Sequence, residues 1–306
     1  MKLYIIGNGF DLAHRLPTAY WDFRAYLEKM HPDFLESFEQ HYEIYPGASE
    51  EYKRNLLWND FETNLANINE SVIIENALAL DMGLESGPVG IEDTLREYFR
   101  NEYKYIDLLA GYLKHWVRTI RIRDTLPIVS PILKSTDDQF ITFNYTSVLE
   151  NVYGIDSGRV LHIHGSLHDQ DDDPILGHGN SNRIEDIKGR KNHAQISRNE
   201  AEISICSVIH DYYRTTHKNI KNYMRKLTYL WKYPFDEIIV AGHSVAGVDL
   251  PYFRQIDDIT QRKSKWKIYY FRESEKEGMH NNLIEQGFVP KRFELLDSKE
   301  FYDLRR

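Results

Sequence analysis

Two kinds of hydrophobic pattern alternate along this chain, short β-branched runs and longer stretches with helical spacing. The short runs predict strands at 2–6, 139–146, 159–165, 236–241, 266–271 and 292–296. Apolar residues that recur every three or four positions predict helices over 19–44, 50–81, 91–124, 197–231, 250–263 and 274–287. Because strands that are separated by helices form parallel sheets covered on both faces, the pattern predicts a Rossmann-like α/β fold.

The spacing of the strands predicts a large helical insertion. The first strand has no partner near it in the sequence, since the next clear apolar run begins near residue 139. We therefore expect a single domain over 1–306, with a helical insertion or cap at about 19–135 and a second helical segment at about 186–231. No linker rich in proline, glycine or serine divides the chain, which agrees with a single domain.

Small and polar residues follow four of the predicted strands. They are Gly7-Asn8-Gly9, Asn144-Tyr145, His164-Gly165 and Gly242-His243-Ser244. In a parallel sheet, ligands bind at the carboxyl ends of the strands. We therefore expect these four strand ends to form the functional site.

The turn after the first strand has the glycines of a phosphate-binding turn. Gly7 and Gly9 allow backbone N–H groups to approach an anion without a Cβ in the way, and a helix that follows would point its amino terminus there. The third glycine of the dinucleotide fingerprint is absent, because Leu12 stands in its place. A tight strand-to-helix turn without a ligand is the alternative.

Composition narrows the classes of function. Hydrophobic residues make up 42% and charged residues 28% of the 306 positions, as in ordinary globular proteins. The net charge of −9 argues against a broad, sequence-independent grip on nucleic acid, and we interpret the basic stretch at 218–226 as a solvated helical face. The single cysteine, Cys206, excludes an intrachain disulfide and a four-cysteine zinc module. The chain opens without a signal-peptide pattern and has no apolar run of about 18 residues, so we expect a cytoplasmic protein without membrane contact.

Asn144 and His164 offer the most suitable chemistry at the strand ends. An asparagine amide donates and accepts hydrogen bonds at once, which suits the orientation of a water or a sugar hydroxyl, although the same amide also closes Asx-turns. An imidazole titrates near neutral pH and acts as a general base, although a histidine at a strand end also commonly caps a loop. We expect His162 to be a packed or hydrogen-bonded structural histidine. The histidine and aspartate spacing between 162 and 169 does not match that of metallo-hydrolases, so no metal is expected.

Two further motifs carry weaker signals. Gly242-His-Ser244-Val-Ala246 resembles a nucleophile elbow, with alanine in place of the last glycine. A serine hydrolase would need an aspartate and then a histidine downstream, and His280 is the only histidine after Ser244, so this is a minor alternative. The aspartates at 171–173 lack the glycine and the terminal glutamate of a calcium loop, and they predict a solvated turn.

Taken together, these motifs resemble the sirtuin-like superfamily, and most closely the AbiH family of bacteriophage abortive-infection proteins. The stretch GNGFDLAHRLP at 7–17 is similar, without a gap, to the sirtuin stretch G-A-G-x-S-x-x-x-G-I-P. The segment ITFNYT at 141–146 is similar to the sirtuin T-Q-N-I-D segment, and HGS at 164–166 is similar to the H-G segment that follows it. The stretch at 241–253 is similar to the closing motif of AbiH-like proteins.

The resemblance implies an antiphage effector that binds NAD as its substrate and hydrolyses the nicotinamide–ribose bond. It implies that Asn144 and His164 are the catalytic residues. The NAD-binding residues that it implies are Gly7, Asn8, Gly9, Phe10, Asp11, Pro17, Tyr145, Gly165, Gly242, His243, Ser244 and Asp249. It also allows a phage-derived trigger and a second copy of the chain as partners.

Three departures of the chain from the sirtuin pattern bear on its chemistry. Asp11 stands where the pattern has serine, Arg15 where it has glycine, and Thr146 where it has aspartate. The zinc-ribbon cysteines of the protein deacylases are absent, so deacylation of a peptide is not expected. The alternative is a non-hydrolytic nucleotide-binding sensor or toxin that acts through its helical insertion, and the serine hydrolase centred on Ser244 is less favoured.

Overall fold

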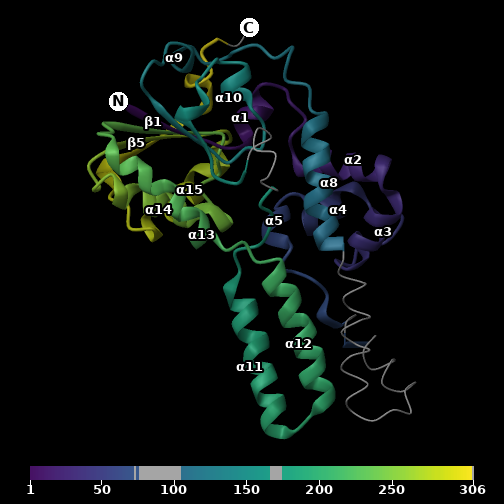
Figure 1. Ribbon diagram of the computed structural model, residues 1–306. Coiled ribbons are helices and arrows are strands. Elements are labelled where there is room, and N and C mark those ends of the chain that lie inside the picture. The colour runs from purple at the N-terminus through teal and green to yellow at the C-terminus, as the bar shows by residue number, and fades with distance from the viewer. Residues whose placement is uncertain (72–73, 76–104, 166–173, 305–306) are drawn as a thin grey trace. The chain divides into compact units, whose positions relative to one another are not determined.

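The computed structural model describes residues 1–71, 74–75, 105–165 and 174–304 (Figure 1). The chain forms two compact units. The sheet unit comprises Met1–Asp22, Leu113–Ile175 and Asn219–Arg306, and the helical unit comprises Phe23–Tyr112 and Leu176–Lys218. Parts of the helices predicted at 50–81 and 91–124, and the turn predicted at 171–173, lie outside the described residues. The helical unit is thus built from two insertions into the chain of the sheet unit.

In the described part of the chain, the sheet unit has six parallel strands in the order β3-β2-β1-β4-β5-β6. Their bounds are β1 Lys2–Ile6, β2 Gln139–Thr142, β3 Val160–His162, β4 Glu237–Ala241, β5 Lys265–Tyr270 and β6 Phe293–Asp297. The predicted α/β fold with a Rossmann-like parallel sheet is confirmed. Because β2 and β3 lie on one side of β1 and β4 lies on the other, the strand order reverses between β1 and β4, where sheets of this kind bind ligands.

The central strands are apolar except at Lys2, Gln139, Thr142 and Glu237, because both of their faces are buried. Leu3 and Ile5 of β1 belong to one hydrophobic core, and Tyr4 and Ile6 belong to the core on the other face. All four residues of β2 are buried, as are the last four of β1 and of β4. A strand that is buried on both sides gives a continuous apolar run rather than an alternating one, which is what the sequence shows.

Helices cover both faces of this sheet. Tyr252 of α14 and Leu283 of α15 join the core that contains Leu3, whereas Phe10 of α1 and Leu149 of α10 join the opposite core. The helical segments of the sheet unit are α1 Asn8–Ala13, α9 Ser130–Leu133, α10 Val148–Asn151, η2 Ser157–Arg159, α13 Ile220–Met224, η3 Arg225–Lys232, η4 Gly247–Asp249, α14 Leu250–Ile259, α15 Glu273–Glu285, η5 Pro290–Arg292 and η6 Ser298–Glu300.

The remaining helices lie wholly or partly in the helical unit. They are α2 Tyr20–Met30, α3 Pro32–Gln40, α4 Glu50–Lys53, the π-helix η1 Arg54–Trp58, α5 Phe61–Asn64, α8 Tyr105–Thr119, α11 Ser181–Ser197 and α12 Glu200–Thr215. The two insertions, Phe23–Tyr112 and Leu176–Lys218, bind to each other inside this unit. The Tyr42 and Tyr212 hydroxyls are 2.7 Å apart, and Lys218 Nζ lies 2.8 Å from a Glu62 carboxylate oxygen. None of the described helices is long and apolar enough to cross a membrane.

Several helix boundaries differ from the sequence prediction; the helix predicted at 197–231, for example, is divided into α12, α13 and η3. The helix predicted at 19–44 is broken at His31, because Pro32 starts a new helix and a residue before proline avoids helical backbone angles. Helix α11 begins at Ser181, before the predicted start of the second helical segment near 186. The side chain of Asn180 accepts a hydrogen bond from the Arg183 N–H and so marks that start.

Candidate functional site at the carboxyl edge of the sheet

The turns that follow β1 and β4 pack directly against each other. The Gly9 N–H donates to the Gly242 carbonyl over 2.8 Å, and the Gly7 N–H donates to the Ala241 carbonyl over 3.0 Å. A Cβ on Gly7 would lie 2.6 Å from the Gly242 carbonyl oxygen, and one on Gly242 would collide with the Phe10 backbone nitrogen. Gly242 also has a φ of +69°, which side chains disfavour. These glycines therefore allow two turns to meet at the point where the strand order reverses.

The same contacts determine which backbone N–H groups of the predicted phosphate-binding turn can donate to a ligand. The Phe10 N–H donates to the Gly7 carbonyl over 2.9 Å, so the amides of Gly9 and Phe10 are both engaged within the protein. Asn8 is exposed, and its side chain donates to the Thr18 carbonyl over 2.8 Å. The glycines thus have a packing role, and phosphate binding at this turn stays a prediction.

Asp11 carries a fully buried carboxyl group at the centre of the site. The carboxylate accepts a hydrogen bond from Asn144 Nδ2 over 2.9 Å and another from the Thr146 hydroxyl. The side chain is 1% exposed, and burial raises the pKa of Asp11 to about 7, although the bonds from Thr146 and Asn144 act in the opposite direction. The N-cap of α1 is Gly7, so Asp11 does not cap that helix. The carboxyl group of Asp11 instead fixes the Asn144 side chain through the hydrogen bond from Nδ2.

Asn144 follows β2 and is held in one orientation. Its Nδ2 donates to the Asp11 carboxylate and, over 3.2 Å, to the Gly7 carbonyl. Because both partners are acceptors, the amide cannot be turned around. Its Oδ1 is buried and has no hydrogen-bond partner among the described residues, so Asn144 does not form the Asx-turn considered above. A buried acceptor without a donor is costly, and it suits a ligand or water that donates a hydrogen bond.

The two histidines near the end of β3 have different surroundings. His162 Nε2 lies 2.7 Å from a Glu150 carboxylate oxygen, and its Nδ1 lies 3.2 Å from the Asn144 carbonyl. The expectation that His162 is a hydrogen-bonded structural histidine is confirmed. His164 is 3% exposed, and its Nε2 lies 3.3 Å from an Asp249 carboxylate oxygen.

The loop after β4 supplies His243, Ser244 and Asp249. His243 Nε2 lies 3.8 Å from the second carboxylate oxygen of Asp249. The Phe143 ring contacts both imidazoles, with ring centroids 5.1 Å from His164 and 4.6 Å from His243. The structure thus brings His164, His243 and Asp249 together, and it adds to the sequence prediction that the Asp249 carboxylate lies between the two imidazoles.

The other predicted binding residues lie at varied depths. Phe10 is fully buried in a hydrophobic core, and Pro17 is exposed. The Tyr145 hydroxyl donates to the Ile175 carbonyl over 2.9 Å, and Gly165 has a φ of +95°. Whether these residues contact a ligand stays a prediction.

The nucleophile-elbow alternative receives little support from the geometry. Ser244 is exposed, and the left-handed backbone angle that an elbow serine would have belongs instead to Val245, at φ +50°. His280 packs against Phe293, with ring centroids 5.4 Å apart, rather than beside Ser244. Within the described residues, no group of three or more histidine, cysteine, aspartate or glutamate side chains is arranged to hold a metal ion.

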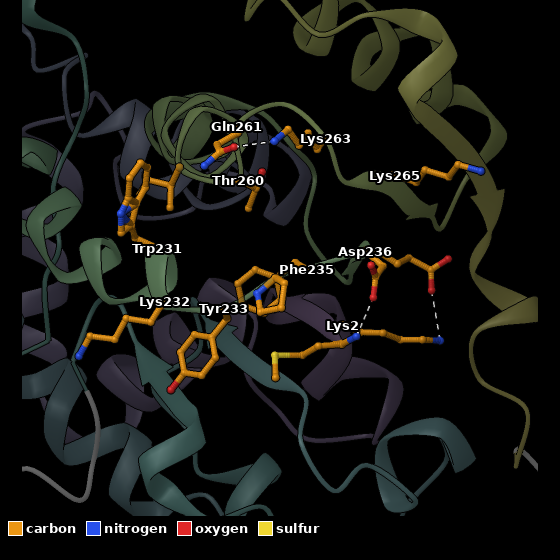
Figure 2. A pocket seen from close by; sticks show the side chains of 14 residues that line it. Lys2, Trp231, Lys232, Tyr233, Phe235, Asp236, Thr260, Gln261, Lys263 and Lys265 are labelled. Atoms are coloured by element: carbon orange, nitrogen blue, oxygen red, sulfur yellow. Dashed lines mark hydrogen bonds and ion pairs between the residues drawn. The ribbon is translucent and has the colours of Figure 1, made fainter.

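A cavity of about 900 Å³ lies at the opposite, amino edge of the sheet (Figure 2). It is lined by the starts of β1, β4 and β5 together with Trp231, which is 65% exposed. Lys232 and Lys265 extend in opposite directions in this view, so the basic groups do not converge on one point (Figure 2). The convergent polar groups are at the carboxyl edge, where parallel sheets bind ligands, and we assign the candidate site to that edge.

Comparison with known proteins identifies the family. A search of curated proteins finds no match. The family model described as bacteriophage abortive infection AbiH matches residues 3–270, a span that begins in β1, ends in β5 and includes every predicted site residue. The chain therefore belongs to the AbiH family of bacteriophage abortive-infection proteins.

Proposed function

We propose that this AbiH protein binds NAD at the carboxyl edge of its sheet and hydrolyses the nicotinamide–ribose bond. Loss of NAD would arrest the infected cell before the phage spreads. The observation that carries the proposal is Asn144, whose buried Oδ1 has no donor among the described residues while its Nδ2 is fixed by Asp11. His164, with a carboxylate beside it, follows the neighbouring strand.

The chemistry suits these two side chains. Nicotinamide leaves its ribose as a neutral molecule, so the site has to support an oxocarbenium-like transition state and deliver water to C1′. In the proposed step, Asn144 Oδ1 accepts a hydrogen bond from the attacking water or a ribose hydroxyl, and His164 accepts the proton that the water loses. The C1′–N bond breaks as the C1′–O bond forms, which gives nicotinamide, ADP-ribose and one proton.

The two departures from the sirtuin pattern at this site support the proposal. Asp11 replaces a serine and Thr146 replaces an aspartate, and these two residues are hydrogen-bonded to each other. A carboxyl group and a hydroxyl group are thus both present, with their positions exchanged. This exchange keeps the chemical groups around Asn144 that the resemblance requires.

The test is release of nicotinamide by protein purified from cells whose growth it has arrested. The wild-type protein should release nicotinamide from NAD, and both Asn144→Ala and His164→Ala should lower the rate by about 100-fold or more. Asp258→Asn, which changes an exposed carboxylate on α14, is the control and should keep the full rate.

Three outcomes would contradict the proposal. Absence of release from folded protein taken from arrested cells would remove the hydrolysis step. NAD binding without release would favour a nucleotide-binding sensor or toxin. Loss of activity in Ser244→Ala together with an active His164→Ala would favour the serine hydrolase.

A further inference from the structure

Asp249 lies between two buried imidazoles. Its Oδ1 is 3.3 Å from His164 Nε2, and its Oδ2 is 3.8 Å from His243 Nε2. The side chains of His164 and His243 are 3% and 7% exposed, and that of Asp249 is 18% exposed. Each carboxylate oxygen therefore faces a different ring, in a place with little water to screen the attraction.

The backbone fixes which nitrogen of His243 carries the proton. The Val245 N–H donates to His243 Nδ1 over 2.9 Å, so Nδ1 is an acceptor. The neutral ring then carries its proton on Nε2, which is the atom that faces Asp249. His243 is thus already oriented to donate to the carboxylate.

The loop after β4 that carries His243 has a strained backbone, and a side chain of α15 holds it in place. Val245 has a φ of +50°, a conformation that β-branched residues avoid. Its side chain is fully buried, and its carbonyl accepts a hydrogen bond from Asn282 Nδ2 over 2.9 Å. Backbone strain of this kind persists where the surrounding structure imposes it, and it concentrates at functional sites.

Phe143 is buried and contacts both imidazoles. Its ring meets His164 at 86° and His243 at 66°, so both are edge-to-face contacts. The Phe143 ring thus packs against both imidazoles, and the Asp249 carboxylate is the polar group that contacts both of them.

We propose that Asp249 is the positioning residue of the site, and that it holds His164 and His243 around one shared carboxylate. This inference rests on the proposed function, in which His164 accepts a proton. When that proton arrives, Asp249 stabilises the imidazolium without becoming protonated itself. His243 faces the second oxygen of the same carboxylate, so Asp249 is the group that the two rings share.

Other titratable groups lie on the neighbouring elements. They are Asp11 of α1, the Glu150–His162 pair of α10 and β3, and Tyr252 of α14, whose ring centroid is 5.9 Å from that of His164. Asp11 is hydrogen-bonded to Asn144 and Thr146, and Glu150 is bonded to His162. Their carboxylates are thus engaged elsewhere, whereas Asp249 contacts both rings.

The direct test is NMR titration of the imidazole groups in the full-length protein without NAD. In Asp249→Asn the titration midpoint of the His164 ring should move to lower pH by about 1 unit, because a negative charge beside it is lost. Asp249→Glu should restore most of this shift, and Asp258→Asn should cause none. Thermal unfolding of each variant confirms that it is folded.

A second variant tests whether the two rings share the carboxylate. In His243→Gln the titration midpoint of the His164 ring should move to higher pH, because a second imidazole no longer faces Asp249. Unchanged His164 titration in both Asp249→Asn and His243→Gln would overturn the proposal. Because no NAD is present, this result stands whether or not the protein hydrolyses NAD.

Kinetics separate positioning from binding. In a protein that releases nicotinamide, Asp249→Asn should lower kcat by about 10-fold or more with KM nearly unchanged. An increase in KM alone, with kcat kept, would show that Asp249 contacts NAD instead.

Discussion

At the scale of single residues, Asp11 combines complete burial with two hydrogen-bond donors. The donors favour the ionised carboxylate, but burial outweighs them and raises the pKa of Asp11 to about 7. A carboxyl group that titrates near neutral pH beside a candidate catalytic amide is typical of a functional site.

The raised pKa predicts how stability changes with pH. In the unfolded chain Asp11 titrates near 3.8, so the folded state binds its proton more tightly. The stabilisation that Asp11 contributes to the folded state is therefore complete below pH 3.8 and is lost as the pH rises towards 7. The difference in free energy of unfolding between wild type and Asp11→Asn should fall by about 2 kcal/mol from about pH 5 to about pH 8.

Urea unfolding at the two pH values measures this difference. Asp258→Asn is the matched control, because Asp258 is exposed and its pKa is lowered by Arg262 and Arg254 despite slight burial. If the difference in free energy of unfolding between wild type and Asp11→Asn does not change with pH, Asp11 is ionised throughout this pH range.

At the scale of elements, the strands are the part of the fold that the sequence predicts best. Each strand lies within a predicted run, or within one residue of it, because a strand that is buried on both faces gives a nearly continuous apolar run. The start of helix α11 is not visible in the sequence, because its buried residues are Ile187 and Ala194 and such a helix has no continuous apolar stripe.

The junction between the turns after β1 and β4 gives a prediction of its own. A Cβ on Gly242 would collide with the Phe10 backbone, whereas Gly154 has the same φ of +69° and nothing within 4 Å of its Cβ position. Gly154→Ala should therefore cost only the backbone strain of about 1 kcal/mol, and Gly242→Ala at least about 3 kcal/mol.

Chemical denaturation of the two alanine variants checks this comparison. Equal losses of stability would show that the two turns separate easily and that Gly242 is needed only for its backbone angle.

The candidate site was only partly predictable. The strand ends that carry Asn144 and His164 were identified because polar residues interrupt apolar runs there. The grouping of His164 with Asp249 and His243 depends on the loop after β4, in which Val245 has a left-handed backbone conformation. No local sequence pattern predicts that conformation for a valine. Contacts between residues far apart in the chain follow from the packing of the whole sheet.

At the scale of the whole molecule, the match to the AbiH family model includes the helical unit and the sheet unit up to residue 270. The helical unit is made of two insertions that are joined to each other by Tyr42 and Tyr212 and by Glu62 and Lys218. An effector that consumes NAD would kill its host if it were always active, so we expect low activity until infection.

The NAD content of cells at the moment of growth arrest tests the central claim most directly, because arrest itself reports that the protein is active. Cells that carry the wild-type protein should lose at least about 90% of their NAD and gain free nicotinamide as growth stops, in keeping with the rates of ordinary enzymes. Cells that carry Asn144→Ala or His164→Ala should keep both their NAD and their growth. Growth arrest by the wild-type protein with NAD unchanged would contradict the account.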